Sequence, residues 1–172
     1  MQLLPSRSGG NVAVSERIVY FAYGSNMGTA RLRERAPSAK PIAIGRLPSH
    51  VLSWDKRSRA DGSGKCDAEA TGRSGDVVWG VLFELDAQDK PALDRAEGVG
   101  AGYVEKRVTI LTDDGAVDAL TYCATEKDPA LRPYRWYKAL VVAGAREHQL
   151  PADYRRQLER VPTVSDLPPA RA

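Results

Sequence analysis

Hydrophobic and polar residues follow one another in short blocks that predict an alternation of strands and helices. The apolar and aromatic run Ile18–Ala22 is typical of a buried strand, and Val77–Leu85 is a longer run of the same kind. Two further runs, Val104–Thr112 and Val117–Thr125, flank the sequence DDG at 113–115, which is a strong hairpin signal. The pattern therefore predicts at least four strands, two of them joined by a tight turn.

Helical patterns occur early in the chain and again near its middle. Thr29 is placed to cap a helix that runs to Ala36, where the following proline favours its end. A second helix is predicted over Asp86–Glu97, with Asp86 or Asp89 as its cap and Gly98 just beyond its last residue.

The other segments complete this pattern. Pro41 to Trp54 mixes apolar and turn residues and predicts one or two strands, and Arg57 to Gly64 is polar and glycine-rich, as in a loop. Two helices are predicted late in the chain, over Tyr134–Glu147 and Ala152–Arg160, with a junction near Pro151.

Strands and helices in this irregular order predict an α+β fold whose mixed sheet can close on itself. A doubly wound parallel sheet fits less well, because too few crossover helices are available. We expect one domain over residues 18–162, a flexible N-terminal arm over 1–17 and a flexible C-terminal tail over 163–172.

The composition of the 172 residues is that of an ordinary globular protein, with a net charge of only +3. That charge does not call for a nucleic-acid partner. Eight basic residues lie between Arg31 and Arg59, and only Glu34 and Asp55 oppose them. We favour a solvated face here. The alternatives are a field that attracts a carboxylate-bearing ligand and, as a weaker rival, a nucleic-acid-binding surface.

Several classes of protein are not indicated. No apolar run is long enough for a signal peptide or a membrane span, so we expect a cytoplasmic protein without a membrane partner. The cysteines Cys66 and Cys123 and the histidines His50 and His148 lack the spacing of metal ligands. We therefore expect neither a metal nor a cofactor.

The first candidate for chemistry is the sequence YFAYGSN at 20–26, where a strand runs through a tight turn into a helix. Such a turn directs several backbone N–H groups at one point, which suits a carboxylate or an oxyanion, and Gly24 permits close approach of a ligand. An ordinary strand–turn–helix junction is the alternative. Ser25 could act as a nucleophile only with a base in reach, so we favour a turn or cap role for it.

The second candidate is Glu97, in the last turn of its predicted helix. The negative end of the helix dipole and partial burial would both raise the pKa of this carboxyl toward the range of a general base. The alternatives are a solvent-exposed glutamate at a frayed helix end and the neighbouring acid Asp94.

Together these motifs resemble the γ-glutamylcyclotransferase family. The resemblance covers about Tyr20 to Arg160, in family order, through YFAYGSN at 20–26, VWGV at 78–81, LDRAEGV at 93–99, YKAL at 137–140 and GAREHQLP at 144–151. It implies a compact mixed β-barrel flanked by helices, with a ligand cavity at the strand–turn–helix motif.

The resemblance also implies roles for individual residues. The family's catalytic glutamate falls on Glu97, Tyr137 would close the pocket, and Tyr103 is a further wall candidate. The substrate-binding set that it implies is Tyr20, Phe21, Ala22, Tyr23, Gly24, Ser25, Asn26, Tyr103 and Tyr137.

The implied reaction converts a γ-glutamyl group to 5-oxoproline and releases an amino acid or amine, with no cofactor and a small-molecule substrate as the only expected partner. A non-catalytic binding module of the same fold and a cyclotransferase for γ-glutamyl amines are the alternatives. The leaving group and the oligomeric state stay open.

The chain departs from the family pattern in three places. Met27 replaces a leucine often found after the turn, and Lys65 to Ala68 stand where many relatives have glycines, which affects the pocket rim. Glutathione-specific relatives typically have leucine where this chain has Asn26, which argues against that branch.

Overall fold

The computed structural model describes residues 14–166 and confirms the predicted α+β class. Its strands are β1 (Arg17–Ala22), β2 (Lys40–Pro48), β3 (His50–Arg57), β4 (Gly64–Ala70), β5 (Val77–Asp86), β6 (Tyr103–Thr112) and β7 (Gly115–Ala124). Its helices are α1 (Thr29–Arg33), α2 (Lys90–Glu97), α3 (Arg135–Glu147) and α4 (Ala152–Glu159), with short 3-10 turns η1 (Ser25–Met27) and η2 (Ala87–Asp89).

Five of the strands form a closed barrel in the order β1-β5-β2-β6-β7. All neighbours in it are antiparallel except β1 and β7, whose parallel pairing of Tyr20 with Leu120 closes the barrel. The sheet is thus mixed and closed, as predicted. Closure leaves β1 between two strands, so its end delivers the chain directly from the barrel wall into the turn that follows.

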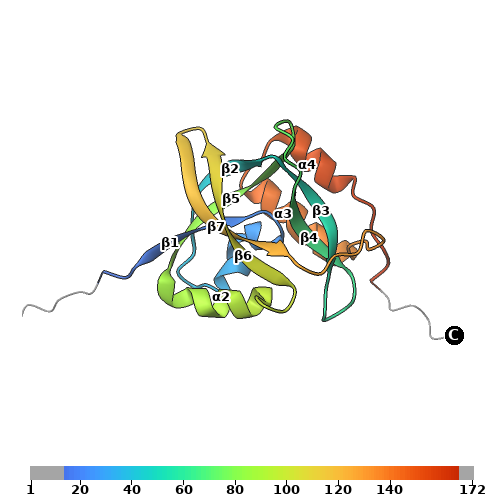
Figure 1. Ribbon diagram of the computed structural model, residues 1–172, viewed down its shortest axis with the longest axis horizontal. Coiled ribbons are helices and arrows are strands. Elements are labelled where there is room, and N and C mark those ends of the chain that lie inside the picture. The colour runs from blue at the N-terminus through green and yellow to red at the C-terminus, as the bar shows by residue number, and fades with distance from the viewer. Residues whose placement is uncertain (1–13, 167–172) are drawn as a thin grey trace, which may run out of the picture.

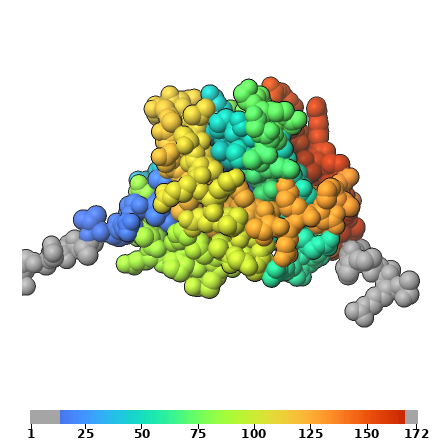
Figure 2. Space-filling view, in the orientation of Figure 1, coloured from blue at the N-terminus to red at the C-terminus, as the bar shows by residue number. Residues whose placement is uncertain are grey.

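The strands β3 and β4 form a separate two-stranded sheet beside the barrel. The segment after β7 holds this sheet in place, since Arg57 N–H donates to the carbonyl of Glu126 and Asp128 N–H donates to the carbonyl of Asp55. In the space-filling view the two-stranded sheet and the β6–β7 hairpin belong to one continuous surface (Figure 2).

The helices pack outside the barrel. In Figure 1, α2 lies along one end of the barrel, and α3 and α4 lie together on the side of β3 and β4. The largest fully buried side chains fill the interior, because burial of apolar area is the main favourable term of folding. They are Phe21, Phe83, Met27, Leu32, Leu82, Leu85, Leu93, Ile110, Leu150, Leu158, Val78 and Val81.

Two local predictions are wrong. The first helix ends at Arg33 rather than Ala36, and its cap is Gly28, with no hydrogen bond from the Thr29 side chain to the helix end. The Glu147 carboxylate accepts from Thr29 N–H at 3.1 Å instead, and the Thr29 hydroxyl contacts His148. The strand β4 begins at Gly64, the last residue of the predicted loop, and continues where the sequence predicted no element.

The described chain extends slightly beyond the predicted domain at both ends. Arg17 pairs with Asp86 at 2.9 Å, and Val164 N–H donates to the carbonyl of Pro133. Residues 1–13 of the predicted arm and 167–172 of the predicted tail lie outside the described residues. Within 14–166, no helix has the length and apolar character needed to cross a membrane.

Candidate active site

A small hollow opens where β1 leaves the barrel, beside the end of α2. It holds about 310 Å³ of unfilled space, its open mouth included. The residues around it come from β1, the turn, β4, α2, β6, β7 and α3. They are Tyr20, Tyr23, Gly24, Ser25, Asn26, Cys66, Glu97, Tyr103, Tyr122 and Tyr137.

The turn at Gly24 is shaped by its surroundings. No backbone carbonyl of residues 14–166 accepts from the N–H groups of Gly24 and Ser25, and both residues line the hollow. A Cβ on Gly24 would lie 3.2 Å from Cys66 Cβ and 3.3 Å from the Tyr137 hydroxyl, which is tighter than ordinary contact. The turn therefore offers backbone donors to a ligand and requires the smallest residue at its centre.

Glu97 reaches the hollow because α2 ends immediately after it. Gly98 adopts the left-handed conformation at φ 70°, and the N–H groups of Gly98 and Val99 donate to the last carbonyls of the helix. The buried Leu93, one turn earlier, anchors the helix on the barrel. The sequence signal of a glutamate followed by glycine thus corresponds to a fixed helix end.

The Glu97 carboxyl is joined to the turn by Asn26. The amide Nδ2 of Asn26 donates to Glu97 Oε1 at 2.5 Å and lies 3.2 Å from the Tyr20 hydroxyl. Asn26 is itself buried. The acid and the YGSN turn, predicted separately from sequence, therefore face one hollow and are connected by one side chain.

Burial raises the pKa of the Glu97 carboxyl above its ordinary value, because desolvation disfavours the charged form. The Asn26 hydrogen bond opposes this rise, as do the positive charges of Arg35, Lys56 and Arg31. These three cations belong to the basic stretch between Arg31 and Arg59, so part of that stretch acts on the candidate site. Burial was one of the two predicted causes of the raised pKa, together with the helix dipole, and desolvation by burial is the largest cause.

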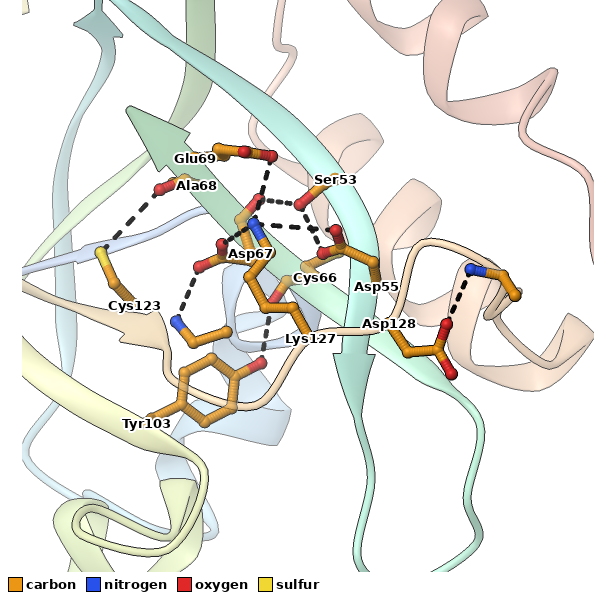
Figure 3. A network of polar contacts seen from close by, with 12 residues as sticks. Ser53, Asp55, Cys66, Asp67, Ala68, Glu69, Tyr103, Cys123, Lys127 and Asp128 are labelled. Atoms are coloured by element: carbon orange, nitrogen blue, oxygen red, sulfur yellow. Dashed lines mark hydrogen bonds and ion pairs between the residues drawn. The ribbon is translucent and has the colours of Figure 1, made fainter. Parts of the chain in front are cut away.

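Tyr103 and Tyr137 both hold the backbone of Cys66 (Figure 3 shows the first of these contacts). The Tyr103 hydroxyl donates to the Cys66 carbonyl at 2.7 Å, and the Cys66 N–H donates to the Tyr137 hydroxyl at 3.2 Å. Burial raises the pKa of the Cys66 thiol, which disfavours the reactive thiolate. Cys66 is thus a wall of the hollow.

An ion network fixes β4, and with it Cys66, to the barrel (Figure 3). The buried Asp67 accepts from Ala124 N–H at 2.7 Å and pairs with the Lys127 ammonium at 2.9 Å. Lys127 also contacts Glu69 at 3.1 Å and Asp55 at 3.7 Å. Because Asp67 directly follows Cys66, this network determines where the wall stands.

Tyr122 connects the hollow to the surface of α2. Its hydroxyl donates to Asp94 Oδ1 at 2.6 Å, and Lys90 pairs with Asp94 at 2.8 Å and with Glu105 at 2.5 Å. Asp94, the rival acid, is therefore engaged with Tyr122 and Lys90, while Glu97 faces the hollow.

The late helix α3 supports the turn from behind. A Cβ on Gly144 would lie 2.7 Å from Met27 Cβ and 2.8 Å from Gly28 N, so helix and turn are in direct backbone contact. His148 Nε2 lies 2.9 Å from the Met27 carbonyl. The GAREHQLP segment at 144–151 thus acts as a buttress for the turn.

Most of the predicted site residues line the hollow, and two do not. Phe21 is fully buried in the core and Ala22 pairs with Val81 in the barrel, and neither is among the residues around the hollow, so their role in substrate binding stays a prediction. Sequence reasoning missed Tyr122 and treated Cys66 only as a departure at the rim. The strand predicted over Val117–Thr125 contains Tyr122, but only barrel closure brings this residue to the site.

Residues 14–166 contain no group of three or more histidine, cysteine or acidic side chains able to hold a metal ion.

Comparisons with known proteins agree with this architecture. A family model described as the AIG2-like family matches residues 77–158. The gamma-glutamylcyclotransferase of Bos taurus is 33% identical over 150 residues, which is 85% of this chain and 79% of the relative. The Homo sapiens protein of that name is 32% identical over 155 residues, with the same coverage of 85% and 79%.

A solved structure gives the same result in three dimensions. The structure of a gamma-glutamyl cyclotransferase superposes with a TM-score of 0.80 at 30% identity, over 87% of this chain and 90% of the other. The barrel and its flanking helices are therefore shared over nearly the whole described chain.

Proposed function

The chain belongs to the γ-glutamylcyclotransferase family, and we propose that it converts a γ-glutamyl substrate to 5-oxoproline with Glu97 as the general base. One observation carries the assignment of the base. The Glu97 carboxyl and the YGSN turn line the same hollow, and Asn26 joins them.

The reaction is an acyl transfer within one molecule. The α-amine of the γ-glutamyl group attacks its own γ-carbonyl carbon, so that a C–N bond forms and closes a five-membered ring. The amine is mostly protonated at neutral pH and must lose a proton first. Glu97 takes that proton and returns it to the leaving nitrogen as the original C–N bond breaks. The second proton, which the attacking nitrogen loses on ring closure, passes to the released amine directly or through solvent. Water is neither consumed nor released.

The backbone of the turn serves the negative groups of the substrate. We propose that the N–H groups of Gly24 and Ser25 bind the α-carboxylate or the oxyanion of the tetrahedral intermediate. Their lack of backbone acceptors within residues 14–166 supports this role. Donors fixed in advance cost no reorganisation when charge develops on the substrate.

The walls of the hollow keep the substrate folded. Tyr103 and Tyr137, fixed through Cys66, would press the γ-glutamyl chain into the bent form that ring closure needs. Intramolecular reactions gain about 7–11 kcal/mol when the reacting groups are well oriented. Much of that advantage is present in the substrate already, so the protein mainly selects a conformation and moves a proton.

We propose further that no metal or organic cofactor takes part, because nucleophile and electrophile belong to one substrate and need only acid–base help. A cytoplasmic location stays a prediction from the sequence.

A substrate panel with free 5-oxoproline as the readout tests the function. The panel contains γ-glutamyl amino acids, γ-glutamyl amines and glutathione. Release of 5-oxoproline from at least one γ-glutamyl amino acid is expected. Binding without product from any member would favour the non-catalytic module, and product from the amines alone would favour the γ-glutamyl amine cyclotransferase.

A further inference from the structure

Lys56, on β3, is a buried lysine whose ammonium has neither an acidic nor a hydrogen-bonding partner among residues 14–166. Its residue exposure is 8%, yet no acidic side chain pairs with it and no hydrogen-bond acceptor contacts its ammonium in that range. The neighbouring cations differ. Arg57 pairs with Asp128 at 2.7 Å, Lys65 with Asp61 at 3.1 Å, and Lys127 with Asp67 at 2.9 Å.

An unpaired buried charge is costly, and proteins usually retain one only where something compensates it. Burial lowers the pKa of Lys56, which is the direction expected when the charged form loses water. Glu97 and Glu126 act on Lys56 as nearby charges without pairing with it, and a bound carboxylate would add a direct contact.

The ammonium of Lys56 lies at the edge of the candidate active site. It sits 4.5 Å from the centre of the Tyr103 ring, and Tyr103 lines the hollow. A Cβ on Gly102 would lie 3.0 Å from both Cε and Nζ of Lys56, so the absence of a side chain at Gly102 makes room for the lysine. The charges of Lys56 and Glu97 act on one another.

The tip of this lysine is open to a ligand. Lys56 Nζ is absent from the atoms of the described chain that are both sealed from solvent and without a hydrogen-bond partner. Since Nζ has no hydrogen-bond partner, it must be exposed to solvent to be absent from that set. The charge is therefore fixed by the Tyr103 ring on one side and reachable on another.

A γ-glutamyl amino acid has two carboxylates, one on the glutamyl part and one on the leaving amino acid. The turn at Gly24 and Ser25 is suited to the first, and Lys56 lies beside Tyr103, which is another lining residue of the hollow. We infer that Lys56 binds the carboxylate of the leaving amino acid and makes γ-glutamyl amino acids better substrates than γ-glutamyl amines. This inference rests on the proposed function and names its specificity determinant.

The test compares γ-glutamyl-alanine with its carboxamide, γ-glutamyl-alaninamide, in which the leaving group has no negative charge. Wild-type protein, Lys56→Gln and Arg57→Gln are assayed for kcat/KM by release of 5-oxoproline. Arg57→Gln is the matched control, because Arg57 follows Lys56 on the same strand and both substitutions remove one positive charge. A charge-assisted hydrogen bond is worth roughly 10- to 100-fold in affinity.

Wild-type protein and Arg57→Gln should prefer the acid over the carboxamide by about that factor. Lys56→Gln should lose the preference because its kcat/KM falls further on the acid than on the carboxamide, and Lys56→Arg should recover part of that preference. Removal of the Lys56 charge also changes the field at Glu97 and so affects both reactions, and the carboxamide reaction measures this shared effect. Thermal unfolding reports whether Lys56→Gln is folded.

The two possible failures give different results. If wild-type protein releases 5-oxoproline but Lys56→Gln keeps the wild-type preference, or loses both substrates equally, the role of Lys56 is overturned and the proposed function stands. If wild-type protein releases 5-oxoproline from neither compound nor from any other γ-glutamyl substrate, both fail.

Discussion

The side-chain amide of Asn26 donates a hydrogen bond of 2.5 Å to Oε1 of Glu97, although 71 positions separate the two residues in the chain. The contact joins the end of α2 to the turn that follows β1, and so fixes the candidate base relative to the backbone donors. It also holds an acid whose charged form burial disfavours. The predictions below depend on that arrangement.

Replacing Glu97 by glutamine should lower the rate of 5-oxoproline formation by roughly 10²–10⁴-fold, the usual contribution of a general base. Glutamine keeps an oxygen that can accept from Asn26, so the variant should fold. Steady-state assays with a γ-glutamyl amino acid measure the effect. Asp94→Asn is the comparison, and it should stay within about 10-fold of wild type, below the usual contribution of a general base. The reverse order of effects would transfer the role of base to Asp94.

The activity should rise with pH, and the midpoint of this rise should lie above the ordinary pKa of a glutamate. Glu97 acts as a base only when ionised, and burial raises its pKa. A profile of kcat/KM from pH 4 to pH 9 on wild-type protein measures this rise. A midpoint at or below the pKa of about 4.3 of an unperturbed glutamate would contradict the buried environment.

Glu97→Gln should be more stable than wild type at neutral pH, by an amount that shrinks on acidification. The folded-state pKa of Glu97 is raised, so its contribution to stability is complete below the unfolded-state pKa and is lost as pH rises through the folded-state value. Glutamine has no such loss. Thermal unfolding at several values between pH 4 and pH 8 measures the gap. If the wild type is the more stable protein at neutral pH, burial does not destabilise the ionised form of Glu97.

Gly24→Ala should lower kcat/KM by narrowing the hollow, and should cost about 1–3 kcal/mol of stability, the usual penalty for overpacking. The 5-oxoproline assay and denaturant unfolding measure the two effects. The added methyl would press against Cys66 and Tyr137, at 3.2 Å and 3.3 Å. Gly24 has a negative φ of −109°, so the neighbours rather than the backbone conformation exclude the side chain.

Gly28→Ala is the matched control for that variant, because its methyl would meet its nearest neighbours at 3.6 Å and 3.7 Å, an ordinary contact. It should keep nearly full activity. Equal losses in the two variants would show that the turn resists any added methyl, rather than that the hollow is narrow at Gly24.

Tyr137→Phe should lower activity less than Glu97→Gln does and should cost about 1–3 kcal/mol of stability, the usual penalty for a buried donor without a partner. The lost hydroxyl accepts from the Cys66 N–H. Denaturant unfolding and the 5-oxoproline assay measure the two effects. A loss of activity as large as that of Glu97→Gln would make Tyr137 a proton donor instead of a wall.

Local signals in the sequence predicted the parts of the site that local structure determines. The strand end, the tight turn at Gly24 and the helix ending at Glu97 each depend on residues close together in the chain. The DDG hairpin is of the same kind, and β6 and β7 pair from Thr112 with Gly115 onward.

Features that depend on distant pairings could not be predicted in this way. Cys66 stands in the wall because Asp67 binds Ala124 N–H, 57 positions away, and Tyr122 reaches the site through barrel closure. The cap of α1 was misassigned for the same reason, since Glu147 supplies the acceptor from 118 positions away. A single sequence contains no local pattern that predicts contacts between residues so far apart in the chain.

Both tyrosine hydroxyls on Cys66 contact its main chain, at the carbonyl and at the N–H. Any amino acid other than proline offers those same two groups. The main-chain contacts that hold position 66 are therefore independent of the side chain at that position. That side chain contributes to the width of the hollow near Gly24. Selection or engineering can exchange that side chain to admit larger or smaller substrates while the framework around it stays anchored.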